Sequence, residues 1–96
     1  MWSKKCITNL ITTINQVETH YDHELDFVGL QEASEWDYIA SNCRALNKMH
    51  YVQCKNKFEE SIIFYNSRKF KLEAAKCGTI EIAGRPYIIL FLTIIK

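Results

Sequence analysis

The sequence is short of the residues that usually interrupt a chain: its 96 residues include three glycines and one proline. No glycine-, serine- or proline-rich tract separates one part of it from another. A chain of this length usually forms one domain, since domains most often have about 100–150 residues. We therefore expect residues 1–96 to form a single domain with a small core and little stability in reserve.

Hydrophobic runs of membrane-spanning length are also missing. The most apolar stretch, YIILFLTII at residues 87–95, has nine residues, whereas a spanning helix needs about 20. Near the start, Thr8, Thr12 and Thr13 interrupt the apolar segment that a signal peptide would require. We expect no membrane span and no secretory signal.

Closely spaced cysteine pairs are absent as well. The CxxC spacing that is typical of redox and zinc sites does not occur among Cys6, Cys43, Cys54 and Cys77. Without a secretory signal, this pattern favours an intracellular, reducing compartment, the cytoplasm or the nucleus. We expect the four thiols to be free and mostly packed.

The chain carries no large excess of charge, with 12 basic and 11 acidic residues. This balance gives no electrostatic reason to expect binding to DNA, RNA or an anionic membrane. The basic residues between Lys55 and Lys71 are interleaved with glutamates, which favours a mixed, solvated surface. A nuclease is not excluded, because its metal site would itself be acidic.

Two helices are predicted in the first half of the chain. Apolar residues recur at helical spacing and predict a helix from about Ser3 to about Thr19. A short apolar strand, Asp26–Leu30, follows. Ser34 as a cap, with Asp37 three residues on, predicts a second helix that ends near Asn47. The apolar face of the first helix comprises Ile7, Leu10, Ile11, Ile14 and Val17.

The second half of the chain has the period of strands. Apolar and polar residues alternate loosely through four or five segments, and TIEIA predicts Ile80 and Ile82 inside with Glu81 outside. Asn66 and Ser67 suit a turn, and Gly84 suits the first central position of a tight hairpin turn. The last segment is apolar on both faces, which predicts a central strand.

These elements predict an α+β (layered α/β) fold in which two helices pack on one face of a mixed, largely antiparallel sheet. Two helices cover only one side of a sheet. The second face would then be a bare apolar surface of a size that is unusual on a soluble monomer. We expect something else to pack there.

Glu32 is the main candidate for a functional residue. It directly follows the predicted strand Asp26–Leu30 and Gln31, and the carboxyl ends of strands are where ligands bind in layered α/β sheets. A carboxylate there could hold Mg²⁺, which prefers oxygen ligands. One glutamate does not make a metal site, however, and acidic residues are common before helix starts. From position alone, a solvated Glu32 is favoured.

The segment LDFVGLQEAS resembles the D-I-(I/V)-(G/A/C)-L-Q-E motif of the endonuclease/exonuclease/phosphatase superfamily, which has the deoxyribonuclease-I-like fold. WSKKCITNLI resembles that family's W-x-x-R lead-in to the first helix, with Lys5 where arginine is usual. EESIIFYNSRKFKL resembles its central hairpin, with Ser61 in place of glycine, and GRPYIILFL resembles the following strand. The resemblance covers nearly the whole chain, in order.

This resemblance implies that Glu32 is a ligand of a catalytic Mg²⁺ or Mn²⁺ ion, in a family that cleaves phosphodiester or phosphomonoester bonds by metal-assisted attack of water. It also implies that the chain corresponds only to the N-terminal portion of the family's domain, which is the first half of a four-layer sandwich. The family's first strand with its metal-binding asparagine precedes the region present here. Its catalytic Asp, Asp-x-Asn pair and Ser-Asp-His follow it. No histidine of this chain matches.

We therefore predict a truncated metal-dependent phosphodiesterase or nuclease-like domain that is inactive alone. The substrate would be nucleic acid or another phosphoester. The alternative is a non-catalytic interaction module that binds a partner or itself through an exposed apolar sheet face. A third option is a separate partner chain that supplies the missing half.

Other candidate residues have simpler explanations. His20, His23 and the acids beside them are best explained as a solvated loop rather than a metal cluster. Cys43 and Cys54 lack a paired base, so packed thiols are favoured over nucleophiles. Trp36 lies on an apolar helix face, where a core role is favoured over base stacking. Glu59 or Glu60 would have at most a supporting role.

Overall fold

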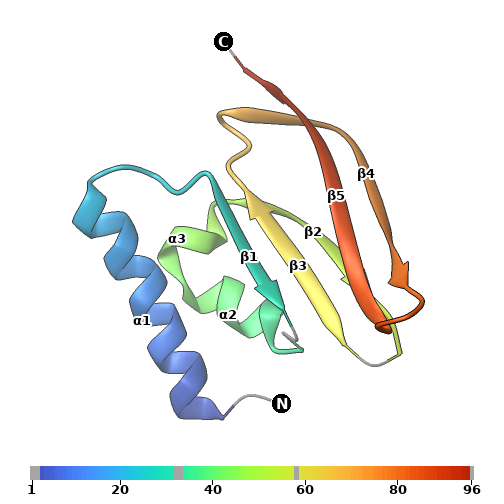
Figure 1. The fold of residues 1–96 in the computed structure, drawn as a ribbon. Coiled ribbons are helices and arrows are strands. Elements are labelled where there is room, and N and C mark those ends of the chain that lie inside the picture. The colour runs from blue at the N-terminus through green and yellow to red at the C-terminus, as the bar shows by residue number, and fades with distance from the viewer. Residues whose placement is uncertain (1–2, 32–33, 58, 96) are drawn as a thin grey trace.

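A computed structural model describes residues 3–31, 34–57 and 59–95 of the chain. Within these residues the fold is α+β, as predicted, with three helices and five strands (Figure 1). Among them, no helix combines the length and the apolar character needed to cross a bilayer. The elements in chain order are α1 (Lys4–Tyr21), β1 (Phe27–Gln31), α2 (Trp36–Asn42), α3 (Arg44–Asn47), β2 (His50–Lys55), β3 (Glu60–Tyr65), β4 (Phe70–Ile80) and β5 (Arg85–Ile94).

Helix α1 confirms the first predicted helix. Ser3 is its N-cap, and the Ser3 side chain accepts a hydrogen bond from the backbone N–H of Cys6. The helix ends at Asp22, whose φ of 53° lies in the left-handed region. Ile7 and Ile14 are buried, whereas Val17 at the end of the predicted apolar face is 40% exposed.

The predicted second helix is divided in two. Cys43 has an extended backbone, with φ −112° and ψ 111°, and it separates α2 from α3. The Asn15 side-chain oxygen accepts a hydrogen bond from the backbone N–H of Ala45 at 3.0 Å, which satisfies a free donor at the start of α3. Ser34 is not the cap that was predicted, because Glu35 occupies that position.

The first three strands form sheet A, in the order β1-β3-β2, with antiparallel pairing throughout. In its register Leu30 lies opposite Ile62, and Val28 opposite Phe64. Since side chains on a strand alternate between faces, these residues share one face of the sheet. The three helices cover that face (Figure 1).

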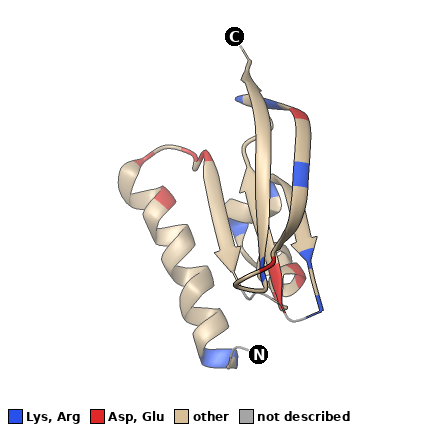
Figure 2. Ribbon diagram, turned by 45° about the vertical axis from the view of Figure 1, so that its right-hand side comes forward, with Lys and Arg blue, Asp and Glu red and all other residues tan. Residues whose placement is uncertain are grey.

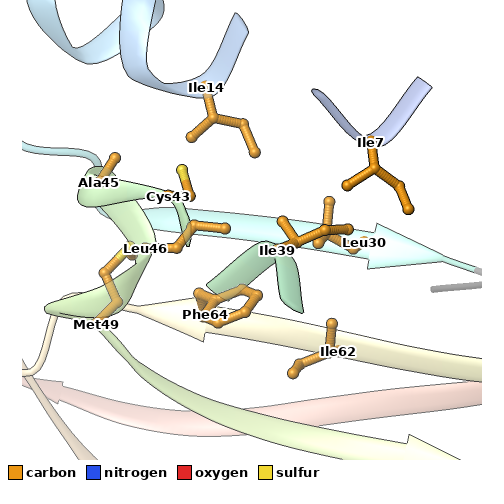
Figure 3. Packing of buried hydrophobic residues seen from close by; sticks show 10 residues of the cluster. All are labelled: Ile7, Ile14, Leu30, Ile39, Cys43, Ala45, Leu46, Met49, Ile62 and Phe64. Atoms are coloured by element: carbon orange, nitrogen blue, oxygen red, sulfur yellow. The ribbon is translucent and has the colours of Figure 1, made fainter. Parts of the chain in front are cut away.

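The hydrophobic core lies between the helices and sheet A (Figure 3). Ile7 and Ile14 of α1 point toward Leu30 of β1, with Ile62 and Phe64 of β3 on the far side. The most deeply buried members are at most 1% exposed, as a close-packed interior requires. They are Ile39, Cys43, Ala45, Leu46, Ile62 and Phe64.

The last two strands form a separate two-stranded sheet, the β4–β5 hairpin. The prediction of a single sheet with β5 at its centre is therefore wrong. The hairpin lies on the face of sheet A opposite the helices, where Phe27 of β1 contacts Phe70 of β4 with ring centroids 4.8 Å apart. The second face of sheet A is thus not bare, because the chain's own hairpin packs on it.

The turn of the hairpin also differs from the prediction. Its strands pair up to Ile80 and Arg85, so residues 81–84 form a four-residue loop rather than a two-residue turn. Gly84 is the last residue of that loop, with φ 65°, a conformation that glycine adopts at no steric cost. Ile80 and Ile82, predicted inside, are 50% and 102% exposed.

A disulfide joins the two sheets. Cys54 of β2 is bonded to Cys77 of β4, 23 residues apart in the sequence. The expectation that all four thiols are free is wrong for this pair, since β2 and β4 bring two distant cysteines face to face. It holds for Cys43, which is free and buried, and for Cys6, which is free but exposed rather than packed.

Candidate functional site

The site predicted from the sequence lies at the carboxyl end of β1. Glu32, the predicted metal ligand, is outside the residues that the structure describes. Its neighbour Gln31 is the last residue of β1 and pairs with Ser61 of β3. Position 32 therefore directly follows the edge of sheet A at which β1 ends and β3 begins.

A groove of about 410 Å³ lies at this edge. It is bounded on one side by the end of β1 and the start of β3, and on the other side by the start of β5. The groove thus separates sheet A from the turn end of the hairpin. Its lining residues are Gly29, Leu30, Gln31, Ser61, Ile62, Ile63, Pro86, Tyr87 and Ile88.

Among the described residues, the polar side chains on the groove are an amide and two hydroxyls, those of Gln31, Ser61 and Tyr87. Such groups donate and accept hydrogen bonds but supply no charge to a cation or to a developing oxyanion. The ring of Tyr87 lies across Gly78 of β4, where a side chain of any other residue would come within 2.6 Å of its hydroxyl. The absence of a side chain at Gly78 therefore leaves room for the Tyr87 ring.

The two glutamates at the start of β3 are engaged in ion pairs. Glu59 pairs with Arg85 at 3.5 Å, and Glu60 pairs with Lys55 at 3.4 Å. Glu60 also accepts a hydrogen bond from the Gln53 side chain at 3.0 Å. These contacts connect the loop before β3 to the start of β5 and to β2.

In the described part of the chain, no group of three or more His, Cys, Asp or Glu side chains could hold a metal ion. His20 lies in the last turn of α1 and packs edge-on against Tyr21. Glu24 forms an ion pair with Arg68 and accepts a hydrogen bond from the Asn66 side chain at 2.8 Å. His20 and His23 are both exposed, in keeping with the solvated segment predicted.

Asn66 links the start of β1 to the turn before β4. Its backbone N–H donates to the carbonyl of Asp26 at 2.9 Å, and its side-chain oxygen accepts from the backbone N–H of Arg68 at 3.0 Å. Asn66 is buried, so these bonds satisfy polar groups that water does not reach. The Asn66–Ser67 turn predicted from the sequence is confirmed, together with a network that the sequence did not reveal.

The basic residues around the hairpin have acidic partners. Lys69 pairs with Asp26 at 3.0 Å, and Lys71 pairs with Glu73 at 3.8 Å. Basic and acidic positions alternate along the hairpin and the neighbouring loops (Figure 2). This supports the prediction of a mixed, solvated surface rather than a phosphate-binding track.

Trp36 belongs to the core, as predicted. It packs against the buried cluster and contacts the ring of Tyr51 on β2, with centroids 4.7 Å apart. The Tyr51 ring in turn contacts Phe64, with centroids 6.0 Å apart. The contact between Trp36 and Tyr51 thus links the start of α2 to β2.

Some large apolar side chains on the outward face of the hairpin are open to solvent. Ile89 is 45% exposed and Phe91 is 56% exposed, and Ala74 lies opposite Phe91 on β4. We call these three residues the outer hairpin surface.

A stretch of 71 residues is 31% identical to an uncharacterized protein of Acanthamoeba polyphaga mimivirus. It covers 71% of this chain and 14% of the viral protein, so the chain spans a small part of that protein's length. No family model and no solved structure matches the chain.

Proposed function

We propose that the chain is a portion of a metal-dependent phosphodiesterase or nuclease-like domain and that it does not catalyse hydrolysis by itself. Gln31, the residue before Glu32 in the sequence, is the last residue of β1 and lines the groove. Ligands commonly bind at the carboxyl ends of strands in layered folds. The position of this groove, together with the sequence motif, supports a role for Glu32 in binding Mg²⁺ or Mn²⁺.

The polar groups on the groove support the proposal that the chain does not catalyse hydrolysis by itself. Metal-assisted hydrolysis needs a held metal, a base or activated water, and groups that stabilise the developing charge. The described lining offers one amide and two hydroxyls, without a carboxylate, a histidine or a cation. These parts are too few to supply the ~8 kcal/mol or more of barrier lowering that enzymes provide.

Metal binding and cleavage are tested separately. Mn²⁺ binding is measured by the paramagnetic broadening of NMR signals from Gln31 and Ser61, and cleavage by incubating the chain with plasmid DNA and Mg²⁺ or Mn²⁺. We expect weak broadening at these residues that Glu32→Ala abolishes, and no cleavage. Glu81→Ala, in the exposed hairpin loop, is the matched control and should retain the broadening.

Either result can contradict the proposal. Broadening that persists in Glu32→Ala, or that is lost in both variants, would remove Glu32 as a ligand. Cleavage of plasmid by the wild-type chain that Glu32→Ala abolishes would show that the portion is active alone.

The outer hairpin surface supports a second candidate function, an interaction module. Contiguous exposed apolar side chains on a soluble protein often mark interaction sites. Ile89 and Phe91 lie side by side on one face of β5, where they are open to solvent. In this case the chain would bind a partner or a second copy without catalysis.

This candidate predicts self-association or strong binding of a dye that reports exposed apolar surface. Solution mass by light scattering and fluorescence of the dye are compared for the wild type and for Ile89→Thr with Phe91→Thr. Loss of association or of dye fluorescence in the double variant supports the candidate. A wild-type monomer that binds no dye contradicts it.

A further inference from the structure

We propose that the Cys54–Cys77 disulfide is a redox-sensitive clamp that holds the turn end of the β4–β5 hairpin against sheet A and thereby sets the width of the groove beside Gln31. This inference does not depend on the proposed phosphodiesterase relationship. It rests on the position of the disulfide relative to the two ends of the hairpin and to the groove.

One end of the hairpin is attached independently of the disulfide. The chain enters β4 directly from the Asn66 turn, and Phe70 packs on Phe27. The backbone N–H of Ile95, after the end of β5, donates to the carbonyl of Lys69 at 2.8 Å. This end behaves as a hinge, because its position is fixed by chain connectivity, a hydrogen-bonded turn and an aromatic contact.

The disulfide lies toward the other end. Cys77 pairs with Ile88 in the hairpin register, three pairs from the Ile80–Arg85 pair that closes the loop. Ile88 itself lines the groove, as do its neighbours Pro86 and Tyr87. The cross-link therefore acts on the segment that forms the hairpin side of the groove.

This end is also held by the half-buried Ile88 and by two polar contacts. The Asn56 side chain donates a hydrogen bond to the carbonyl of Gly84 at 3.0 Å. Arg85, whose side chain is 58% exposed, pairs with Glu59. Solvent-exposed ion pairs contribute little to stability, so the covalent bond is the strongest attachment of the turn end.

The two cysteines differ in exposure. Cys54 is 3% exposed, whereas Cys77 lies on an exposed part of β4. A small thiol or a thiol–disulfide oxidoreductase can therefore attack from the Cys77 side. The reaction is balanced as exchange: two thiols of the reductant become one disulfide, and Cys54 and Cys77 each become a thiol, with two electrons and two protons transferred.

In the reducing compartment that we expect from the sequence, such a bond would act as a reversible switch. Disulfides in cytosolic proteins are usually transient or redox-sensing rather than permanent. Reduction would release the turn end and widen the groove, while the hinge end and the core under the helices stay in place. Oxidation would close the hairpin onto β1 and β3.

Limited proteolysis measures the release directly. The chain is equilibrated with oxidised glutathione, or reduced and capped with N-ethylmaleimide, and the small molecules are removed before trypsin is added. Cleavage after Lys76, next to the clamp, is compared by mass spectrometry with cleavage after Lys71, near the hinge. We expect reduction to raise cleavage after Lys76 by about tenfold or more, because proteolysis follows the population of the open state.

Two variants serve as controls. Cys6→Ser, which removes the other exposed cysteine, should respond to reduction as the wild type does. The double variant Cys54→Ser with Cys77→Ser should be cleaved rapidly after Lys76 under both conditions. If that double variant fails to fold, the proposal is still tested by cleavage after Lys76 and after Lys71 in the oxidised and the reduced wild-type chain.

Three outcomes would overturn the clamp. Mass spectrometry could find that Cys54 and Cys77 do not form a bond in oxidised glutathione. Cleavage after Lys76 could be the same with and without the bond. Cleavage after Lys48, Lys71 and Lys76 could rise together, which would indicate general loosening of the fold rather than release of one end.

Discussion

The two faces of sheet A are covered in different ways. On the helix side, α1, α2 and α3 bury a continuous apolar cluster, and Ile62 and Phe64 of β3 are each 1% exposed. On the hairpin side, the inward residues Ile88, Leu90 and Leu92 of β5 are only half-buried. The first interface is a close-packed core, whereas the second combines partial burial with a covalent cross-link.

This difference shows how a short chain stabilises two layers that bury different amounts of apolar surface. Free energy from apolar burial scales with the area removed from water, so the helix side contributes most of it. The hairpin side buries less, and the Cys54–Cys77 bond restricts the unfolded chain instead. We therefore expect the two layers to respond differently to substitution and to reduction.

The largest effect is expected from truncation of the core on the helix side. Phe64→Ala removes a fully buried ring and should lower the free energy of unfolding by about 3–5 kcal/mol. Leu90→Ala, on the half-buried inner face of the hairpin, should cost about 1 kcal/mol. Urea unfolding followed by circular dichroism measures both. Equal losses for the two variants would contradict the difference between the layers.

The next effect is that of the disulfide. Reduction of Cys54–Cys77 opens a loop closed over 23 residues of sequence and should lower the free energy of unfolding by about 3 kcal/mol. Urea midpoints with and without reductant give this value, with the Cys54→Ser and Cys77→Ser double variant as the reductant-insensitive control. Unchanged midpoints on reduction would show that the bond adds no stability.

A smaller effect is expected at the connection between the layers. Asn66→Ala removes the side-chain bonds to Glu24 and Arg68 and leaves partly buried polar groups unpaired, at a cost of about 1–3 kcal/mol. Asn42→Ala is the matched control, because its side chain bonds only to an exposed helix carbonyl in the described contacts. A control as destabilised as Asn66→Ala would refute the role of the Asn66 network.

The smallest effect is expected at the tip of the hairpin. Ile82 is 102% exposed, so Ile82→Ser removes no packing. Its melting temperature should equal that of the wild type, as is usual for surface substitutions. A clear loss of thermal stability, measured by differential scanning fluorimetry, would mean that Ile82 is covered in solution, for example by a second copy.

Sequence patterns predicted the helix side well. The 3.6-residue period that places Ile7 and Ile14 on one face gave α1, and the short apolar run gave β1 within one residue at each end. These elements depend on local patterns and burial. The break at Cys43 was not predictable, because the Asn15 oxygen that satisfies the start of α3 lies 30 residues from its partner Ala45.

The hairpin side was predicted poorly for a related reason. Alternation identified β4 and β5 but not the sheet to which they belong, since a strand that is apolar on both faces fits a central position and a second layer equally well. Ile80 and Ile82 obey the alternation, yet they lie at the turn end, where there is nothing to cover them. The pairing of Cys54 with Cys77 follows from the layering and not from sequence spacing.

The candidate site was predicted in part. The strand before Gln31 and its position at the sheet edge follow from the apolar run and the motif, and both are found in the structure. The groove itself was not predicted, because its second side is formed by Pro86, Tyr87 and Ile88, which reach it only through the folding of the hairpin over sheet A. The role of Glu32 stays a prediction.

Native-state hydrogen exchange on the reduced chain tests the central claim, that the helix-covered layer and the hairpin are separately held. We predict that amides of β3 exchange only through global unfolding, whereas those of β4 and β5 near Cys77 exchange through a lower-energy local opening. In the oxidised chain, the opening free energies of the β3 amides and of the hairpin amides should be more similar than in the reduced chain. A single common opening energy for β3 and the hairpin in the reduced chain would contradict the account.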